Sequence, residues 1–115
     1  MEPTQLFKIL SDETRLRILM LIDIEKELCV CELISALTAS QPSISRNLAQ
    51  LRKSGLLVGR KYKQWVFYAI NPALPAWQKT ILDLSSQQNN SLVSADIQRL
   101  NDMGKRPERT QQLCG

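Results

Sequence analysis

The spacing of apolar residues in the first half of the chain predicts a run of amphipathic helices. These helices cover residues 3–10, 14–25, 28–37 and 41–54. In the fourth helix, Ile44, Leu48 and Leu51 recur at i, i+4 and i+7 as a buried stripe. Ser40 is a natural N-cap for this helix, and Gly55 is a natural residue to end it. We therefore expect two short helices joined by a tight break at residues 38–41.

After Gly55 the pattern changes from helical to β-structure. Residues 56–58 and 65–70 are rich in strand-forming side chains, and the polar segment 59–64 lies between them. This arrangement predicts a β-hairpin with a basic tip. Two helices joined by a tight break and followed by a hairpin indicate a winged helix-turn-helix, which is mainly α with a small β-hairpin.

The C-terminal part of the chain predicts one long helix and a short tail. From about Ala76, apolar residues at helical spacing continue to Met103, with a polar weak point at 85–91. We expect one domain over residues 1–103 and a flexible tail over 104–115. The last helix has more apolar positions than one small core needs. With the first helix it is expected to form the two-fold interface of a homodimer.

The charge distribution points to a polyanionic partner. The net charge is +4, and residues 33–82 hold seven basic residues and no acidic one. A solvated basic face normally carries acidic residues as well, so this acid-free block favours nucleic acid as the partner. Its basic residues are Arg46, Arg52, Lys53, Arg60, Lys61, Lys63 and Lys79.

The fourth helix is the candidate recognition helix and the hairpin is the candidate wing. The helix offers side chains that can hydrogen-bond base edges in a major groove: Gln41, Ser43, Ser45, Arg46, Asn47 and Gln50. The basic residues near the helix end and on the hairpin are expected to contact phosphates: Arg52, Lys53, Arg60, Lys61 and Lys63. The predicted partner is double-stranded operator DNA, pseudo-palindromic to match a dimer.

Composition argues against an enzyme and against a membrane protein. The chain has no histidine, which removes the commonest general base and the commonest zinc ligand. No segment approaches the roughly 20 apolar residues of a membrane span. The first five residues lack the basic start of a secretory signal, so a cytoplasmic location is expected.

Two of the three cysteines stand in the run ELCVCEL, residues 27–33. Together with SQPSISRNLAQLRKSGLL (40–57) and WVFYAI (65–70), this run resembles the ArsR/SmtB family of metal-responsive repressors, and most closely its arsenic-responsive branch. The resemblance covers roughly residues 5–80, and Cys29-Val-Cys31 is its most specific element. It implies a dimeric winged-helix repressor of a resistance operon that leaves its operator when As(III) or Sb(III) binds cysteine thiolates.

The chemistry of the cysteines agrees with this resemblance. Thiolates select soft ions, and a helix start favours the thiolate form. Residues i and i+2 of a regular helix point about 200° apart. Cys29 and Cys31 could therefore share one ion only if the first turn of their helix deforms, and such a change is expected to move the recognition helix.

The sequence departs from the arsenic-responsive pattern at two positions. Ile34 stands where a third cysteine is common, so either Cys114 from the tail completes the ligand set or two thiolates suffice. A two-thiolate site would also suit a monosubstituted organoarsenical. Asn47 stands where relatives often have histidine, which leaves the operator preference open.

Three other interpretations remain. The same cysteines could sense oxidants or reactive sulfur, with Cys114 as a resolving thiol. A small thiol reductase would need an activating base or a CxxC arrangement, and the chain has neither. A winged helix that binds protein instead of DNA is disfavoured by the acid-free block.

Overall fold

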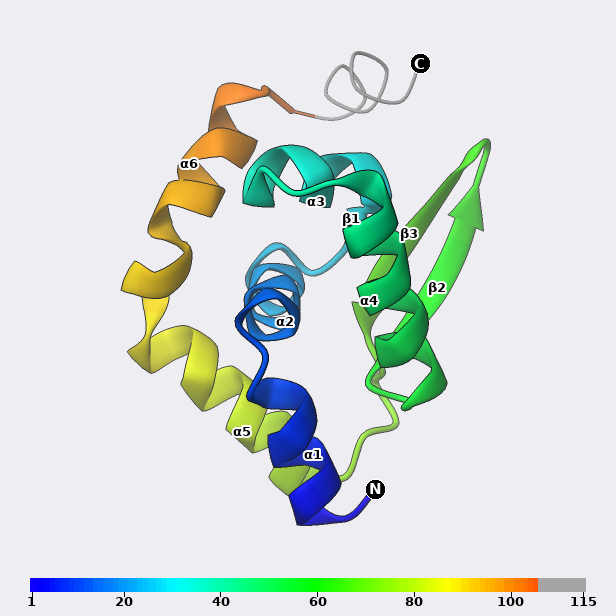
Figure 1. Ribbon diagram of the computed structural model, residues 1–115, viewed down its shortest axis with the longest axis vertical. Coiled ribbons are helices and arrows are strands. Elements are labelled where there is room, and N and C mark those ends of the chain that lie inside the picture. The colour runs from blue at the N-terminus through cyan, green and yellow to red at the C-terminus, as the bar shows by residue number, and fades with distance from the viewer. Residues whose placement is uncertain (106–115) are drawn as a thin grey trace.

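The four helices expected in the first half of the chain are present in the computed structural model, which describes residues 1–105 (Figure 1). They are α1 (Pro3–Leu10), α2 (Glu13–Glu25), α3 (Val30–Leu37) and α4 (Gln41–Lys53). The Ser40 hydroxyl caps α4 by accepting a hydrogen bond from the backbone nitrogen of Ser43 at 3.3 Å. Gly55 follows α4 with φ +88°, a left-handed conformation that glycine adopts without steric cost.

The sheet has one strand more than the expected hairpin. The hairpin itself consists of β2 (Leu57–Tyr62) and β3 (Trp65–Ile70). A third strand, β1 (Leu28–Cys29), pairs antiparallel with β3 and gives the order β1-β3-β2. The prediction of a helix over 28–37 is therefore wrong for its first two residues. A strand of two residues is too short to show an alternating pattern in the sequence. It is a strand because β3, a segment far away in the sequence, pairs with it.

The last part of the chain is broken where a single long helix was expected. The elements are α5 (Ala76–Gln88), the 3-10 helix η1 (Asn90–Val93) and α6 (Ser94–Asp102). The break falls within the polar segment 85–91, so the weak point was correctly located although the continuous helix was wrong. In Figure 1, α5 and α6 lie on the side opposite the hairpin, and α6 passes beside α3.

Helix α2 is the centre of the core. Its residues 18–22 are all buried, since other elements surround this helix instead of covering only one face. The buried stripe of α4 packs into the same core through Ile44, Leu48 and Leu51, which confirms its expected orientation. Within residues 1–105, no helix is long and apolar enough to span a bilayer.

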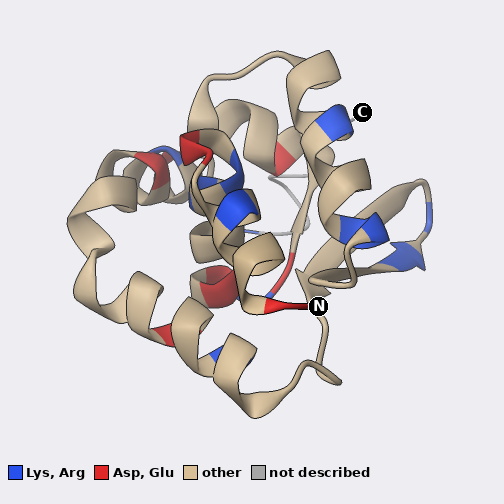
Figure 2. Ribbon diagram, turned by 60° about the horizontal axis from the view of Figure 1, so that its bottom comes forward, with Lys and Arg blue, Asp and Glu red and all other residues tan. Residues whose placement is uncertain are grey.

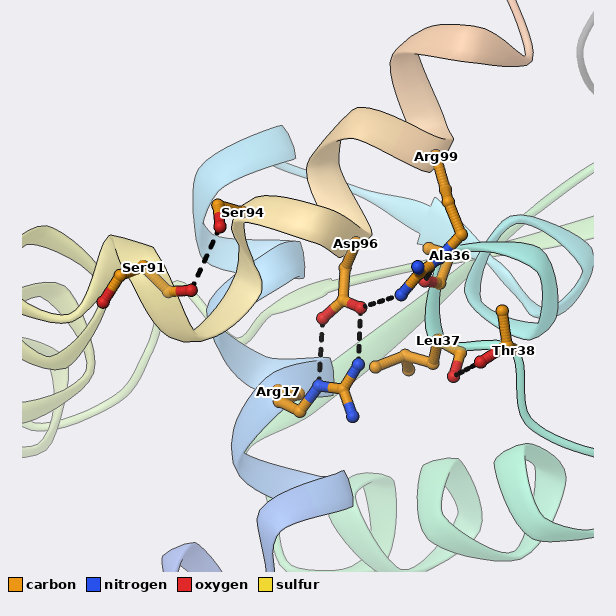
Figure 3. A network of polar contacts seen from close by, with 8 residues as sticks. All are labelled: Arg17, Ala36, Leu37, Thr38, Ser91, Ser94, Asp96 and Arg99. Carbon is orange, nitrogen blue, oxygen red and sulfur yellow. Dashed lines mark hydrogen bonds and ion pairs between the residues drawn. The ribbon is translucent and has the colours of Figure 1, made fainter.

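A buried carboxylate ties α6 to the helix-turn-helix (Figure 3). Asp96 is 1% exposed and accepts hydrogen bonds from Arg17 of α2 at 2.9 and 2.5 Å and from Arg99 at 2.6 Å. The Arg99 Nε donates in turn to the backbone oxygen of Ala36, in the last turn of α3, at 2.6 Å. The C-terminal helix therefore braces α3 through one continuous polar network.

Candidate nucleic-acid interface and thiol site

The outer face of α4 is polar and open to solvent. Gln41, Ser45, Arg46 and Gln50 are exposed, as the sequence predicted for a surface that reads base edges. Ser43 and Asn47 are only half-buried on the flank of the helix. The Asn47 Nδ2 donates to the Ser43 carbonyl oxygen at 2.9 Å, so this amide donor already serves the helix backbone.

The hairpin and α4 together carry basic residues and no acidic one. Figure 2 shows blue segments on α4 and on the neighbouring hairpin and no red segment on either. Lys53, Lys61 and Lys63 are all exposed, as expected for contacts with phosphates. The Lys63 ammonium lies 5.5 Å from the centre of the Tyr62 ring. The structure therefore places α4, the candidate recognition helix, beside the strand that leads to the wing cations.

A hollow lies between α4 and the sheet, and Arg52 is one of the residues that line it. It has a volume of about 390 Å³ and is lined by residues of α3, α4 and β3: Val30, Ser45, Ala49, Arg52, Lys53 and Tyr68. The Arg52 guanidinium approaches Gly59 so closely that a Cβ at this glycine would lie 3.3 Å from Arg52 Nη1. Arg52 thus stands at the exposed end of α4 and contacts the base of the wing.

Arg60 of the wing is held by an ion pair as well as by aromatic rings. Its guanidinium donates to both carboxylate oxygens of Glu27, from Nη2 at 2.5 Å and from Nε at 3.2 Å. It also lies 5.3 Å from the centre of the Phe67 ring and 5.8 Å from that of Tyr62. Sequence reasoning missed Glu27, because nothing in the local pattern reveals a pairing made by a residue 33 positions away.

A cross-strand row joins the first cysteine to the wing. Cys29 of β1 pairs with Phe67 of β3, and Phe67 pairs with Arg60 of β2. Directly paired residues of an antiparallel sheet project to the same face. The thiol, the phenyl ring and the guanidinium therefore share one face of the sheet. Glu27, which directly precedes β1, forms the ion pair with Arg60 at the other end of this row.

Cys29 is a buried N-cap and not a residue within a regular helix. It is 2% exposed, its backbone is extended, and its backbone nitrogen donates to Glu32 Oε1 at 3.0 Å. The Cys29 sulfur accepts from the backbone nitrogen of Glu32 in the reciprocal bond of a capping box. Burial raises the pKa of the Cys29 thiol above its ordinary value. The expectation that the helix start favours the thiolate is wrong at this position, because desolvation outweighs the helix N-terminus.

The two cysteines of the CxC motif come together in one apolar cluster. Cys29, Trp65 and Phe67 form its buried part, and Cys31 packs against it from the first turn of α3. The argument that the sulfurs point about 200° apart required both residues to be helical, and the extended backbone of Cys29 removes that premise. Cys29 is a free cysteine, whereas Cys31 is disulfide-bonded and has to be reduced before it can bind a soft ion.

The ligand set offered by the described residues consists of two sulfurs. Among residues 1–105, no group of three cysteine, aspartate, glutamate or histidine side chains is placed to hold one ion. The predicted third ligand, Cys114, lies outside the described residues. Two thiolates fit a soft ion of trigonal coordination whose third position is taken by another group.

Large apolar side chains are exposed on the elements expected to form a dimer. Phe7 of α1 is 54% exposed and Leu84 of α5 is 51% exposed. Trp77 of α5 and Leu92 of η1 are each 39% exposed. Apolar side chains of this size on neighbouring terminal elements are typical of an interface between copies.

Comparisons with a family model and with individual proteins both identify transcriptional regulators as relatives of this chain. The family model described as "Bacterial regulatory protein, arsR family" matches residues 12–58. The chain is 48% identical over 112 residues to the arsenic resistance transcriptional regulator ArsR2 of Pseudomonas putida, covering 97% of each protein. It is 51% identical over 98 residues to the arsenical resistance operon repressor of Escherichia coli K12, covering 85% of this chain and 84% of that protein.

A solved structure confirms the predicted fold class. The structure of reduced HlyU from Vibrio cholerae superposes with a TM-score of 0.65 and 37% sequence identity, covering 73% of this chain and 84% of that one. The predicted winged helix-turn-helix is therefore correct. The relatives are transcriptional regulators, which confirms the prediction of a regulator instead of an enzyme.

Proposed function

This chain belongs to the arsR family of bacterial regulatory proteins, and we propose that it is a homodimeric repressor of an arsenic or related soft-metal resistance operon. In this proposal As(III) or Sb(III) binds Cys29 and Cys31 and releases the dimer from its operator. The observation that carries the proposal is the packing of both cysteines against Trp65 and Phe67 of the wing strand. The names of the P. putida and E. coli relatives support arsenic as the inducer.

The repressor would read its operator with α4 and hold it with the wing. The exposed Gln41, Ser45, Arg46 and Gln50 are free to enter a major groove, with Ser43 and Asn47 on the flank of the helix. Lys53, Lys61 and Lys63 would contact phosphates, together with Arg60 when it leaves Glu27. This division predicts salt-dependent affinity from the wing and sequence preference from the helix.

A second copy of the chain would cover the exposed apolar residues of α1 and α5. Phe7, Trp77 and Leu84 are exposed although they are large and apolar, and burying them between two copies would stabilise a dimer. A two-fold dimer presents two recognition helices to successive major grooves, which a pseudo-palindromic operator matches.

The two sulfurs fit a thiol-seeking metalloid. They belong to one apolar cluster from which most water is excluded, and among residues 1–105 no group of three cysteine, aspartate, glutamate or histidine side chains is placed to hold a harder ion. The raised pKa of Cys29 keeps this thiol protonated near neutral pH, so water does not have to solvate a buried charge before the inducer arrives.

Release would start at the capping box of α3. A sulfur that binds the inducer no longer accepts the Glu32 backbone hydrogen bond, so the start of α3 loses one of its caps. The same displacement acts on the β1–β3 pairing and on Glu27, two residues before Cys29, which holds Arg60 of the wing. Movement of Cys29 would therefore affect both parts of the proposed DNA-binding surface, the helix-turn-helix and the wing.

The test is fluorescence anisotropy of a labelled DNA fragment from the promoter of the chain's own gene. The fragment is titrated with fully reduced protein at several salt concentrations, and arsenite or antimonite is then added. We expect tight, salt-sensitive binding that the metalloid reverses.

The matched control is Cys29→Ser/Cys31→Ser, which should bind DNA but ignore arsenite. A Cys114→Ser variant tests the tail cysteine: a retained response means that two thiolates suffice, and a lost response makes Cys114 the third ligand. The absence of DNA binding at any salt concentration would refute the repressor itself.

A redox response through the same cysteines is the second candidate function. Support for it comes from the disulfide bond at Cys31 and from a structural neighbour that was solved as reduced HlyU. DNA binding that peroxide or polysulfide reverses, and that arsenite leaves unchanged, would select this function over metalloid sensing.

A further inference from the structure

The indole nitrogen of Trp65 is a buried donor without an acceptor. Trp65 is 9% exposed, and its Nε1 has no hydrogen-bond partner among the described residues. Buried polar groups are nearly always paired in folded proteins, so an unpaired one needs an explanation, such as a group that arrives later. Nothing in the sequence pattern marks this tryptophan, which occupies an ordinary strand position.

The sheet places this donor beside the two cysteines. Trp65 precedes Phe67 by two residues on β3, so both side chains project to the same face. Cys29 is the last residue of β1 and pairs with Phe67. Trp65 therefore lies just beyond the end of β1, where the first turn of α3, which contains Cys31, begins. Trp65 and Cys29 belong to the same buried cluster, and Cys31 packs against that cluster.

The chemistry of a two-thiolate site supplies the missing acceptor. Arsenous acid carries three hydroxyl groups on one As(III) atom. Its condensation with two thiols forms two As–S bonds, breaks two As–O bonds and releases two water molecules, with no change of oxidation state. One hydroxyl remains on the arsenic, and its oxygen can accept a hydrogen bond.

We propose that Trp65 Nε1 donates a hydrogen bond to this remaining hydroxyl, which makes Trp65 a specificity-determining residue of the thiol site. The inference rests on the function proposed above and deepens it. The ligand class is a trivalent metalloid that keeps one hydroxyl group after binding two sulfurs. An arsenical with an organic group in the third position offers no acceptor there and gains nothing from the indole.

The experiment compares arsenite with phenylarsine oxide on fully reduced protein by calorimetric titration. Phenylarsine oxide loses its oxygen as water when it binds two thiols, so its product has no hydroxyl. In Trp65→Phe, the affinity for arsenite should fall about 2- to 10-fold, the effect of one neutral hydrogen bond, while the affinity for phenylarsine oxide is unchanged. Gln98→Ala, at an exposed position of α6 outside the cluster, is the control and should change neither affinity.

The ratio of the two affinities decides the outcome even if Trp65→Phe loosens the site, because a general loss affects both ligands alike. An unchanged ratio overturns the role of Trp65 and leaves the proposed function intact. If the wild-type protein binds neither arsenical, or binds them equally well without Cys29 and Cys31, the proposed function itself fails.

Discussion

Arg60 of the wing donates two hydrogen bonds to the carboxylate of Glu27, two residues before Cys29. This ion pair connects the cation expected to touch DNA with the segment that carries the thiol. It is solvent-exposed, with 55% of the Arg60 side chain and 28% of the Glu27 side chain accessible, so its contribution to stability is small. The ion pair matters for DNA binding because the Glu27 carboxylate offsets the positive charge that Arg60 can offer to a phosphate.

Glu27→Gln should strengthen DNA binding. Removing the carboxylate frees Arg60 for a phosphate, so the slope of log K against log salt should become steeper by up to about 0.9. Affinity at low salt should rise, and Arg60→Gln should lower both quantities. Anisotropy titrations over a range of salt concentrations measure them. If Glu27→Gln weakens binding, the ion pair acts mainly by holding the wing in position.

Cys29 should react slowly with alkylating agents at neutral pH. Burial raises its pKa, so the reactive thiolate is scarce and its fraction grows about tenfold per pH unit until the raised pKa is reached. The variant Cys31→Ser/Cys114→Ser leaves Cys29 as the single cysteine, and its rate with iodoacetamide is followed from pH 6 to pH 10. In urea the midpoint should return to that of an ordinary thiol. Equal midpoints in the folded and unfolded chain would contradict the assignment.

The same shift predicts the pH dependence of stability. A group whose folded-state pKa lies above its unfolded value binds its proton more tightly in the folded protein. The contribution of Cys29 is therefore complete below the unfolded pKa and is lost as the pH rises through the folded pKa. Urea unfolding of this single-cysteine variant should show stability falling at alkaline pH more steeply than in the variant that lacks all three cysteines.

Asp96→Asn should destabilise the protein by about 1–3 kcal/mol, because the substitution leaves Arg17 and Arg99 without their shared buried carboxylate. The cost is limited because both arginine side chains are partly exposed. Urea unfolding measures the effect. Gln98→Ala removes an exposed hydrogen bond to Asp102 on the same helix and should change stability by less than about 0.5 kcal/mol. Equal effects of the two variants would mean that α6 does not brace α3.

Leu84→Lys should convert the dimer to a monomer. Leu84 is 51% exposed on α5, and a lysine there places a charge in the expected apolar interface. DNA affinity should fall at least about 10-fold, because each half-site then binds independently. Sedimentation velocity reports the mass and anisotropy reports the affinity. Asn101→Lys adds the same charge at an exposed position of α6, away from the apolar residues of α1 and α5, and should leave both unchanged if the interface is specific.

The amino-acid sequence by itself determined most of the framework of this protein. The stripe of Ile44, Leu48 and Leu51 predicted which face of α4 is buried, and Ser40 and Gly55 predicted its two ends. These features are local, since a helix is specified by side chains three or four positions apart and by its own caps. The acid-free block and the CxC motif likewise indicated a DNA-binding surface and a thiol site before any contact was known.

The tertiary structure decided how these parts are connected. β1 has two residues and exists because β3 offers them a partner, so no period in the sequence could reveal that Cys29 is extended, buried and paired with Phe67. The Glu27–Arg60 ion pair and the unpaired Trp65 nitrogen depend on the same register. Long-range pairing determines burial, and burial determines the protonation of a thiol and the cost of an unpaired donor. For that reason the sequence predicted which residue types form the site, while the fold determined their protonation and their hydrogen bonding.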